Sequence, residues 1–278
     1  MTQTAGNTPW GASYRMIAAE KWRRKSGLMG RAATRALVEF ARVQSGMQVL
    51  DLASGTGEPA ISVASLVGPG GSVIGIDLNG GPLEIAAARA SERNLANLRF
   101  QTGDAQALPF ADASFDLITS RLGVMFFDDS GRALREAHRV LKPEGRAAFL
   151  VWGPVEQPYF QSTVALVYKQ VGGPLLLPAS ANLFRFAASG SLPGELQAAG
   201  FRTVQEESRT VPWAWEGPPE EMWEYFREVS APFRPLLDSV PPSKAAALER
   251  DVLAAIGRFY DGERVNLSAT FLLVGAQK

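Results

Sequence analysis

Between residues 47 and 152 the sequence alternates short apolar or β-branched runs with helical stretches, and Gly, Pro, Asn or Asp marks each change. This alternation is typical of parallel βαβ units, whose helices cover both faces of a sheet. We expect strands at Gln48–Leu52, Ser72–Asp77, Leu98–Thr102, Phe115–Ser120 and Arg146–Trp152, with helices at Pro59–Val67, Pro82–Asn94 and Gly131–Val140.

The flanking segments extend this core. Residues 1–45 carry a helical pattern that we expect to lie over the mouth of the site, and residues 46–153 form the ligand-binding core. In residues 154–278, strands at Phe201–Val211 and Leu267–Gly275 would complete a seven-stranded sheet, and helices at Pro218–Ser230 and Ser243–Phe259 would form a cap. The predicted fold class is therefore α/β, with a mostly parallel sheet and helices on both faces. The core would bind one ligand, and the helical cap would form the pocket for the molecule that reacts with it.

Composition excludes several classes of function. In 278 residues, 46% hydrophobic content gives ample material for a core, and 28 basic against 28 acidic residues leave no net field to attract nucleic acid. With no cysteine and one histidine, we expect no disulfide and no metal site. Residues 1–9 lack a signal-peptide pattern, and no apolar run approaches the roughly 20 residues of a spanning helix, so we expect a cytoplasmic protein.

The strongest local signal is the run VLDLASGTG at residues 49–57, a strand that leads into a glycine turn and then a helix. Gly55 and Gly57 carry no Cβ, and the helix start presents unpaired N–H groups, so a ligand can approach this backbone closely. The alternative is a tight connection that binds nothing.

Two carboxylates follow at the same edge of the predicted sheet. Asp77 ends the second strand, where α/β sheets hold a ribose, although it could also be a turn or helix-capping residue. Asp104 follows the third strand and could accept an adenine amino proton, with the N–H of Ala105 bonding a ring nitrogen; an Asx turn is the alternative.

The turn departs from the dinucleotide pattern G-x-G-x-x-G, because Ala53 stands where the first glycine would be. Asp51 closes the strand before the turn and would repel a diphosphate, whereas it would attract the ammonium of an amino-acid group. The turn therefore favours a zwitterionic ligand over a pyrophosphate.

Five ordered motifs, DLASGTG at 51–57, Asp77, GDAQALPF at 103–110, SFD at 114–116 and RVLKPEG at 139–145, resemble class I S-adenosylmethionine-dependent methyltransferases. Within them the pattern is most similar to the ubiquinone/menaquinone-biosynthesis branch and its small-molecule relatives. The resemblance implies a Rossmann-like seven-stranded sheet and S-adenosylmethionine as cofactor, with S-adenosylhomocysteine as product. It implies that Asp51, Ala53, Ser54, Gly55 and Gly57 hold the methionine part, Asp77 the ribose, Leu78, Asp104 and Ala105 the adenine, and that Ser120 lines the methyl-donor end.

The acceptor is a second question. Methyl transfer needs alignment more than a fixed catalytic side chain, so the catalytic residue is left open, with Tyr14 as a weak candidate and His138 expected to be structural. Aromatic residues favour an apolar acceptor pocket, although a packed core is an equal alternative. The candidates are Trp10, Tyr14, Trp22, Phe126, Phe127, Trp213, Trp215, Trp223 and Tyr225.

These observations predict methyl transfer to carbon or oxygen of a small, fairly apolar acceptor of aromatic, polyketide or quinone type. An NAD-dependent oxidoreductase on the same sheet and a non-catalytic module that senses S-adenosylmethionine are the competing hypotheses. The acceptor and the oligomeric state stay open, because one sheet hosts many chemistries.

Overall fold

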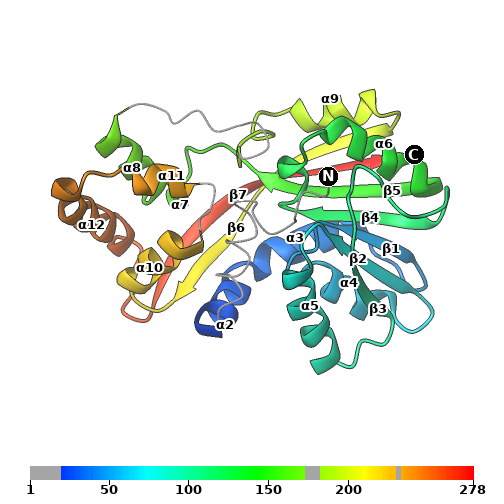
Figure 1. Ribbon diagram of the computed structural model, residues 1–278, viewed down its shortest axis with the longest axis horizontal. Coiled ribbons are helices and arrows are strands. Elements are labelled where there is room, and N and C mark those ends of the chain that lie inside the picture. Colours follow the sequence, from blue (N-terminus) through cyan, green and yellow to red (C-terminus); the bar gives the residue numbers. More distant parts are fainter. Residues whose placement is uncertain (1–19, 173–181, 230–232) are drawn as a thin grey trace, which may run out of the picture. The chain divides into compact units, whose positions relative to one another are not determined.

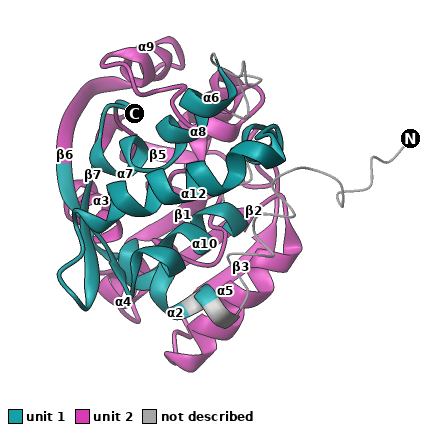
Figure 2. Cartoon of the chain, turned by 90° about the vertical axis from the view of Figure 1, so that its left-hand side faces the viewer, with its two compact units in different colours: residues 1–32, 154–181, 210–270 teal, residues 33–153, 182–209, 271–278 magenta. Residues whose placement is uncertain are grey.

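The computed structural model describes residues 20–172, 182–229 and 233–278 (Figure 1). The chain divides into two compact units (Figure 2). The sheet unit comprises residues 33–153, 182–209 and 271–278, and the aromatic unit comprises residues 1–32, 154–181 and 210–270. Each unit is thus built from segments that are far apart in the sequence.

The sheet has seven strands in the order β3-β2-β1-β4-β5-β7-β6. The strands β3, β2, β1, β4 and β5 are parallel, and β7 pairs antiparallel with β5. Their bounds are β1 Gln48–Leu52, β2 Ser72–Asp77, β3 Leu98–Thr102, β4 Phe115–Arg121, β5 Leu141–Trp152, β6 Arg202–Glu216 and β7 Arg264–Gln277. The two last strands continue from the sheet unit into the aromatic unit.

Helices pack on both sides of the parallel strands, because right-handed crossovers carry the chain outward from β1 in opposite directions. Helices α4 (Ala60–Val67) and α5 (Gly80–Glu92) contact β1 to β3, whereas α6 (Ser130–Val140) contacts β5 (Figure 1). The other helices of this unit are α3 (Arg31–Ala41), the short η1 (Val124–Phe126) and α9 (Ser191–Ala198). Strand residues such as Leu50 and Leu52 are completely buried, as expected for strands covered on both faces.

The aromatic unit has a core of large rings. Its helices are α2 (Glu20–Met29), α7 (Pro158–Gln161), α8 (Val164–Val171), α10 (Pro219–Val229), α11 (Arg234–Asp238) and α12 (Pro242–Gly257). Trp215 stacks on Tyr225 with ring centroids 4.7 Å apart, and Trp22 meets both rings at 5.5 and 5.6 Å. Lys25 of α2 forms an ion pair with Glu221 of α10. These contacts attach α2 to α10.

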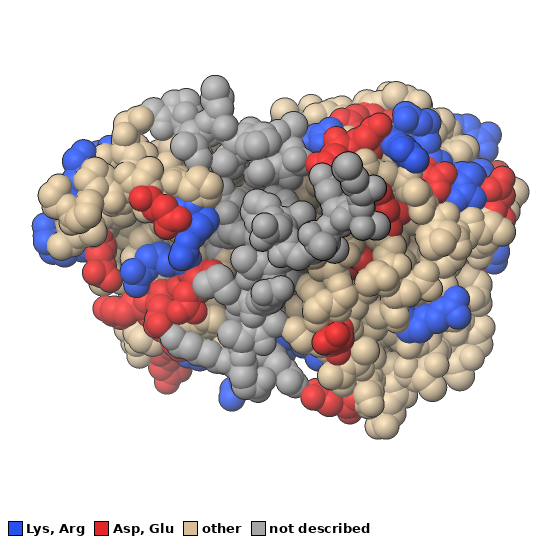
Figure 3. All heavy atoms as spheres, in the orientation of Figure 1, with Lys and Arg blue, Asp and Glu red and all other residues tan. Residues whose placement is uncertain are grey.

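The predicted fold class is confirmed, and the first three strands have the predicted bounds. Strands β5, β6 and β7 are longer than predicted, and β5 begins at Leu141 instead of Arg146. Pro212 lies inside β6, and a proline is tolerated there because β6 is an edge strand of the sheet. No helix of the described residues is long and apolar enough to cross a membrane. On the face in Figure 3, acidic and basic side chains lie among one another, in keeping with the balanced charge.

Candidate functional site

The order of the strands places a switch point between β1 and β4. The chain runs outward from β1 to β2 and β3, and then returns to lay β4 on the other side of β1. In open α/β sheets the crevice beyond the carboxyl ends of such strands is where ligands bind. Asp51, one residue before the end of β1, is in register with Thr119 of β4 and Gly75 of β2.

Among the described acids of the sheet unit, Asp51 has the largest shift in pKa. Its side chain is completely buried, Oδ1 accepts a 2.7 Å hydrogen bond from Thr119 Oγ1, and Oδ2 has no hydrogen-bond partner among the described residues. Burial raises the pKa of Asp51 to about 7, against the opposing effects of hydrogen bonds from Ser54 and Thr119 and of the charge of Arg121. The carboxylate therefore retains an acceptor oxygen with nothing of the described chain to satisfy it.

Both glycines of the turn have positive φ angles, a backbone conformation that favours glycine. Gly55 has φ +50° and Gly57 has φ +110°, and a Cβ on Gly57 would lie 2.6 Å from Ile61 Cδ1. Ser54 Oγ donates to the backbone oxygen of Asp51 at 3.0 Å, and Arg89 of α5 donates to the oxygen of Thr56 at 2.9 Å. These two hydrogen bonds hold the turn in place without a ligand.

Asp77 joins the end of β2 to this turn. Its Oδ2 accepts from the backbone N–H of Gly55 at 2.9 Å, and its Oδ1 accepts from the N–H of Asn79 at 3.0 Å. Burial raises the pKa of Asp77, and these backbone donors act against the shift. The structure therefore brings together Asp51, the turn and Asp77. The next residue, Leu78, has 62% of its surface exposed, which leaves an apolar side chain beside them for a flat ring.

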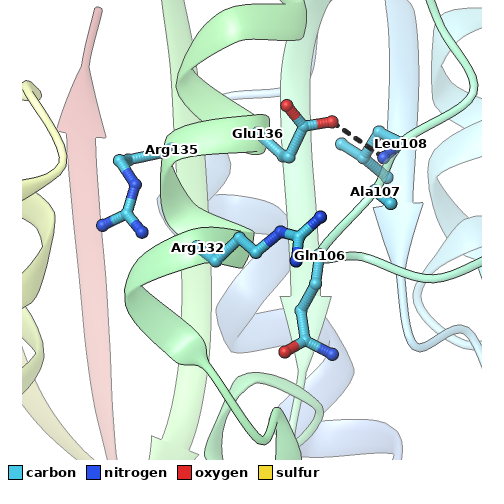
Figure 4. A pocket seen from close by; sticks show the side chains of 6 residues that line it. All are labelled: Gln106, Ala107, Leu108, Arg132, Arg135 and Glu136. Atoms are coloured by element: carbon cyan, nitrogen blue, oxygen red, sulfur yellow. Dashed lines mark hydrogen bonds between the residues drawn. The ribbon is translucent and has the colours of Figure 1, made fainter.

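Asp104 and Ala105 lie after β3, as expected. Asp104 Oδ1 accepts from the backbone N–H of Gln106 at 2.8 Å, an Asx turn, and Gln106 Oε1 accepts from the N–H of Asp129 at 2.9 Å. A polar pocket of about 370 Å³ lies next to this turn (Figure 4). It is lined by Gln106, Ala107, Leu108, Arg132, Arg135 and Glu136. None of the predicted cofactor residues lines this pocket, so we do not assign it to the cofactor.

The other predicted residues divide between the units. Ser120 is buried in β4 and donates to the oxygen of Leu52 at 3.0 Å, and Phe126 is half-buried in η1. Trp213, Trp215 and Trp223 are at most 6% exposed within the aromatic unit, so the described structure shows them as packed rings. Trp10 and Tyr14 lie outside the described residues. His138 packs edge-on against Phe201 with centroids 5.1 Å apart, in agreement with a structural role.

Thr119 and Arg121 were missed by the sequence analysis, and both act on Asp51. Finding Thr119 requires the register of β1 against β4, which are 68 residues apart at this pair. The signal in the sequence is a polar residue inside the apolar run FDLITS, one position before Ser120.

These residue types fit S-adenosylmethionine. The unsatisfied Oδ2 of Asp51 suits an ammonium group, which a neutral or phosphate-bearing ligand does not offer. Asp77 uses one oxygen for each backbone bond and keeps lone pairs for the hydroxyls of a ribose. The exposed Leu78 can pack on adenine.

Comparisons with known proteins agree with this fit. Residues 43–157 match a family model described as a methyltransferase domain. A ubiquinone/menaquinone biosynthesis C-methyltransferase from Xanthomonas campestris is 41% identical over 132 residues, 47% of this chain and 52% of that protein. A demethylmenaquinone methyltransferase from Staphylococcus carnosus is 31% identical over 184 residues, 63% of this chain and 76% of that protein.

The chain spans about half the length of several curated relatives, including the Xanthomonas campestris enzyme. Among solved structures, the YcgJ protein of Bacillus subtilis has the same fold, with a TM-score of 0.56, 22% identity and coverage of 88% of this chain and 97% of that one. The chain therefore belongs to the class I S-adenosylmethionine-dependent methyltransferases, in the branch of the quinone-biosynthesis enzymes.

Proposed function

We propose that this protein transfers the methyl group of S-adenosylmethionine to a carbon atom of a small, apolar, quinone-like or aromatic acceptor. The observation that carries the proposal is the unsatisfied oxygen of the buried Asp51 at the switch point of the sheet. It offers a place for an ammonium group directly beside a glycine turn that a ligand can approach.

Each residue of the site has a distinct role in binding. Asp51 would hold the ammonium of the methionine part, the turn from Ala53 to Gly57 would give backbone contacts to it, and Asp77 would hold the ribose hydroxyls. Asp104 and the N–H of Ala105 would recognise adenine, with Leu78 packed on its face. Ser120, buried beside Leu52, would border the sulfur end of the site.

The cofactor would supply a methyl group on a positively charged sulfur, which is a good leaving group. The chain's task is then to align an acceptor atom with that methyl group and to keep water away from it. An acceptor carbon of a hydroquinone ring is already electron-rich, so a weak base suffices to remove its proton after attack. Tyr14 stays a candidate for contact with the acceptor hydroxyl.

Two features support an apolar acceptor of this type. The curated relatives are named for demethylmenaquinone and for ubiquinone/menaquinone biosynthesis. The equal numbers of acidic and basic residues leave no net field for nucleic acid. Phe126, half-buried in η1 after β4, is the described residue that we place nearest the acceptor.

The test is a methyl-transfer assay with S-adenosylmethionine that carries a deuterated methyl group. A reduced short-chain demethylmenaquinone, a catechol and a simple phenol serve as acceptors, and mass spectrometry with fragmentation locates the label. The proposal predicts a label on a ring carbon of whichever acceptor is methylated, with the quinol as the best of the three acceptors. Labelling on oxygen of the catechol would reject carbon methylation, and labelling of protein or nucleic acid alone would reject a small acceptor.

A further inference from the structure

We propose that Thr119 is a positioning residue for cofactor binding: its hydroxyl occupies Oδ1 of Asp51 and leaves Oδ2 for the ammonium group of the ligand. The inference rests on the proposed function, since it assigns a partner to the acid that would hold the methionine part. Thr119 lies outside the five motifs of the chain, between SFD at 114–116 and RVLKPEG at 139–145.

The two side chains meet because of strand register. Thr119 of β4 is the partner of Asp51 in β1, and neighbouring residues of parallel strands point to the same face. The hydroxyl donates to Asp51 Oδ1 at 2.7 Å, and both side chains are completely buried. The pair lies at the switch point of the strand order, the place where open α/β sheets bind their ligands.

The two oxygens of the Asp51 carboxylate have different surroundings. Thr119 occupies Oδ1, while Oδ2 has no hydrogen-bond partner in the part of the chain that the structure describes. A hydroxyl that donates to a carboxylate stabilises its ionised form, which is the form that attracts a cation. Without the hydroxyl of Thr119, the buried Asp51 would hold its proton to a higher pH.

The other charged groups near Asp51 do not replace this donor. Arg121, two residues farther along β4, favours the ionised form through its charge, and Glu58 after the glycine turn disfavours it. On the opposite side the register partner in β2 is Gly75, which has no charge, and Asp77 at the end of β2 is bonded to the N–H groups of Gly55 and Asn79. Two hydroxyls favour the ionised form of Asp51 by hydrogen bonding. Ser54 Oγ lies 3.0 Å from the backbone oxygen of Asp51, whereas Thr119 Oγ1 donates to the carboxylate oxygen Oδ1 at 2.7 Å.

The test compares the binding of two ligands by calorimetry between pH 5.5 and 8.5. S-adenosylhomocysteine carries the ammonium group, whereas 5′-methylthioadenosine has the same nucleoside and a thioether but no amino-acid part. In the wild type, the affinity for S-adenosylhomocysteine should rise about tenfold from pH 6 to pH 8, because the ionised fraction of a group with a pKa of about 7 rises by that factor. The affinity for methylthioadenosine should show no such rise.

Thr119→Val keeps the shape of the side chain and removes the donor. It should shift the pH profile for S-adenosylhomocysteine upward by about one pH unit, which weakens binding at pH 7 by about fivefold because the ionised fraction of Asp51 falls by that factor. Affinity for methylthioadenosine should be unchanged, and Thr119→Ser should restore the wild-type profile. Thr163→Val is the matched control, because Thr163 is equally buried and its hydroxyl donates to the backbone oxygen of Tyr159 at 2.7 Å in the aromatic unit.

The outcomes separate the two proposals. Binding of S-adenosylhomocysteine with the same affinity and pH profile in the wild type and in Thr119→Val would overturn the role of Thr119 and leave the proposed function intact. Equal weakening of both ligands would also overturn it, because a general disturbance of the site does not select for the ammonium group. No binding of S-adenosylhomocysteine by the wild type at any pH would overturn the proposed function itself. Thr119→Ala, which removes the donor without risk of overpacking, repeats the test if the valine variant does not fold.

Discussion

Asp51→Asn should make the ligand-free protein more stable at neutral and alkaline pH while it weakens cofactor binding. In the folded protein burial raises the pKa of Asp51 to about 7, whereas its ordinary value is 3.8. Below pH 3.8 the acid is protonated in both states and has no pH-dependent effect on folding. As the pH rises from 3.8 to 7 the unfolded chain loses this proton first, so the free energy of unfolding falls.

The size of this effect follows from the difference between the two pKa values. At about 1.4 kcal/mol for each pKa unit, ionising the buried Asp51 costs about 4 kcal/mol of stability above pH 7, as an upper bound. An asparagine keeps an oxygen to accept the hydroxyl of Thr119 and carries no charge, so the variant avoids this cost. Its amide must be desolvated, which offsets part of the gain.

The assay is urea denaturation of the wild type and Asp51→Asn at several pH values from 4.5 to 8.5 without ligand. The difference in unfolding free energy between the two proteins isolates Asp51, since all other groups titrate in both. It should change in favour of the variant by about 2–4 kcal/mol across this range. A difference that stays constant with pH would refute the reasoning, because it would mean that Asp51 is ionised in the folded protein at every pH tested.

Three further predictions concern other parts of the molecule. Asp77→Asn should weaken binding of S-adenosylhomocysteine by about 1–3 kcal/mol in calorimetry, because a charged acceptor is lost. Asp251→Asn on the exposed face of α12 is the control and should leave the affinity unchanged. Equal affinities of the two variants would remove Asp77 from the site. Gly57→Ala should lower the unfolding free energy by about 1–3 kcal/mol, because φ is +110° and the added Cβ would lie too close to Ile61. Gly70→Ala is the control and should be nearly neutral, because a Cβ there would meet no described atom within 4 Å. Similar effects of both variants would contradict the strained turn. Trp215→Ala should lower it by about 3–5 kcal/mol because the ring is completely buried, and unchanged stability with a raised acceptor KM would instead place Trp215 in a pocket.

The sequence was sufficient for the parts of the site that are local in the chain. The strand that ends near Asp51, the glycine turn after it and the acid Asp77 were all identified from neighbouring residues, and the structure joins the turn to Asp77 by one hydrogen bond. The bounds of β1, β2 and β3 were also predicted, because buried apolar runs between Gly, Pro and Asp residues have few alternatives.

The remaining features depend on contacts between distant segments. Thr119 reaches Asp51 through the pairing of β4 with β1, which no local pattern encodes. Apolar pattern alone does not distinguish an aromatic core from an aromatic pocket, and Trp215 and Trp223 are found packed against Tyr225 and Phe226 respectively. That residues 1–45 lie over the site and that residues 154–278 form the acceptor pocket stay predictions.

The most direct test of the whole account is a calorimetric titration of the wild-type protein with S-adenosylmethionine, S-adenosylhomocysteine and NAD in parallel. The account predicts micromolar binding of the two sulfur nucleosides and none of NAD, because Asp51 attracts an ammonium group and repels a diphosphate. Binding of NAD alone, or of none of the three, would contradict it.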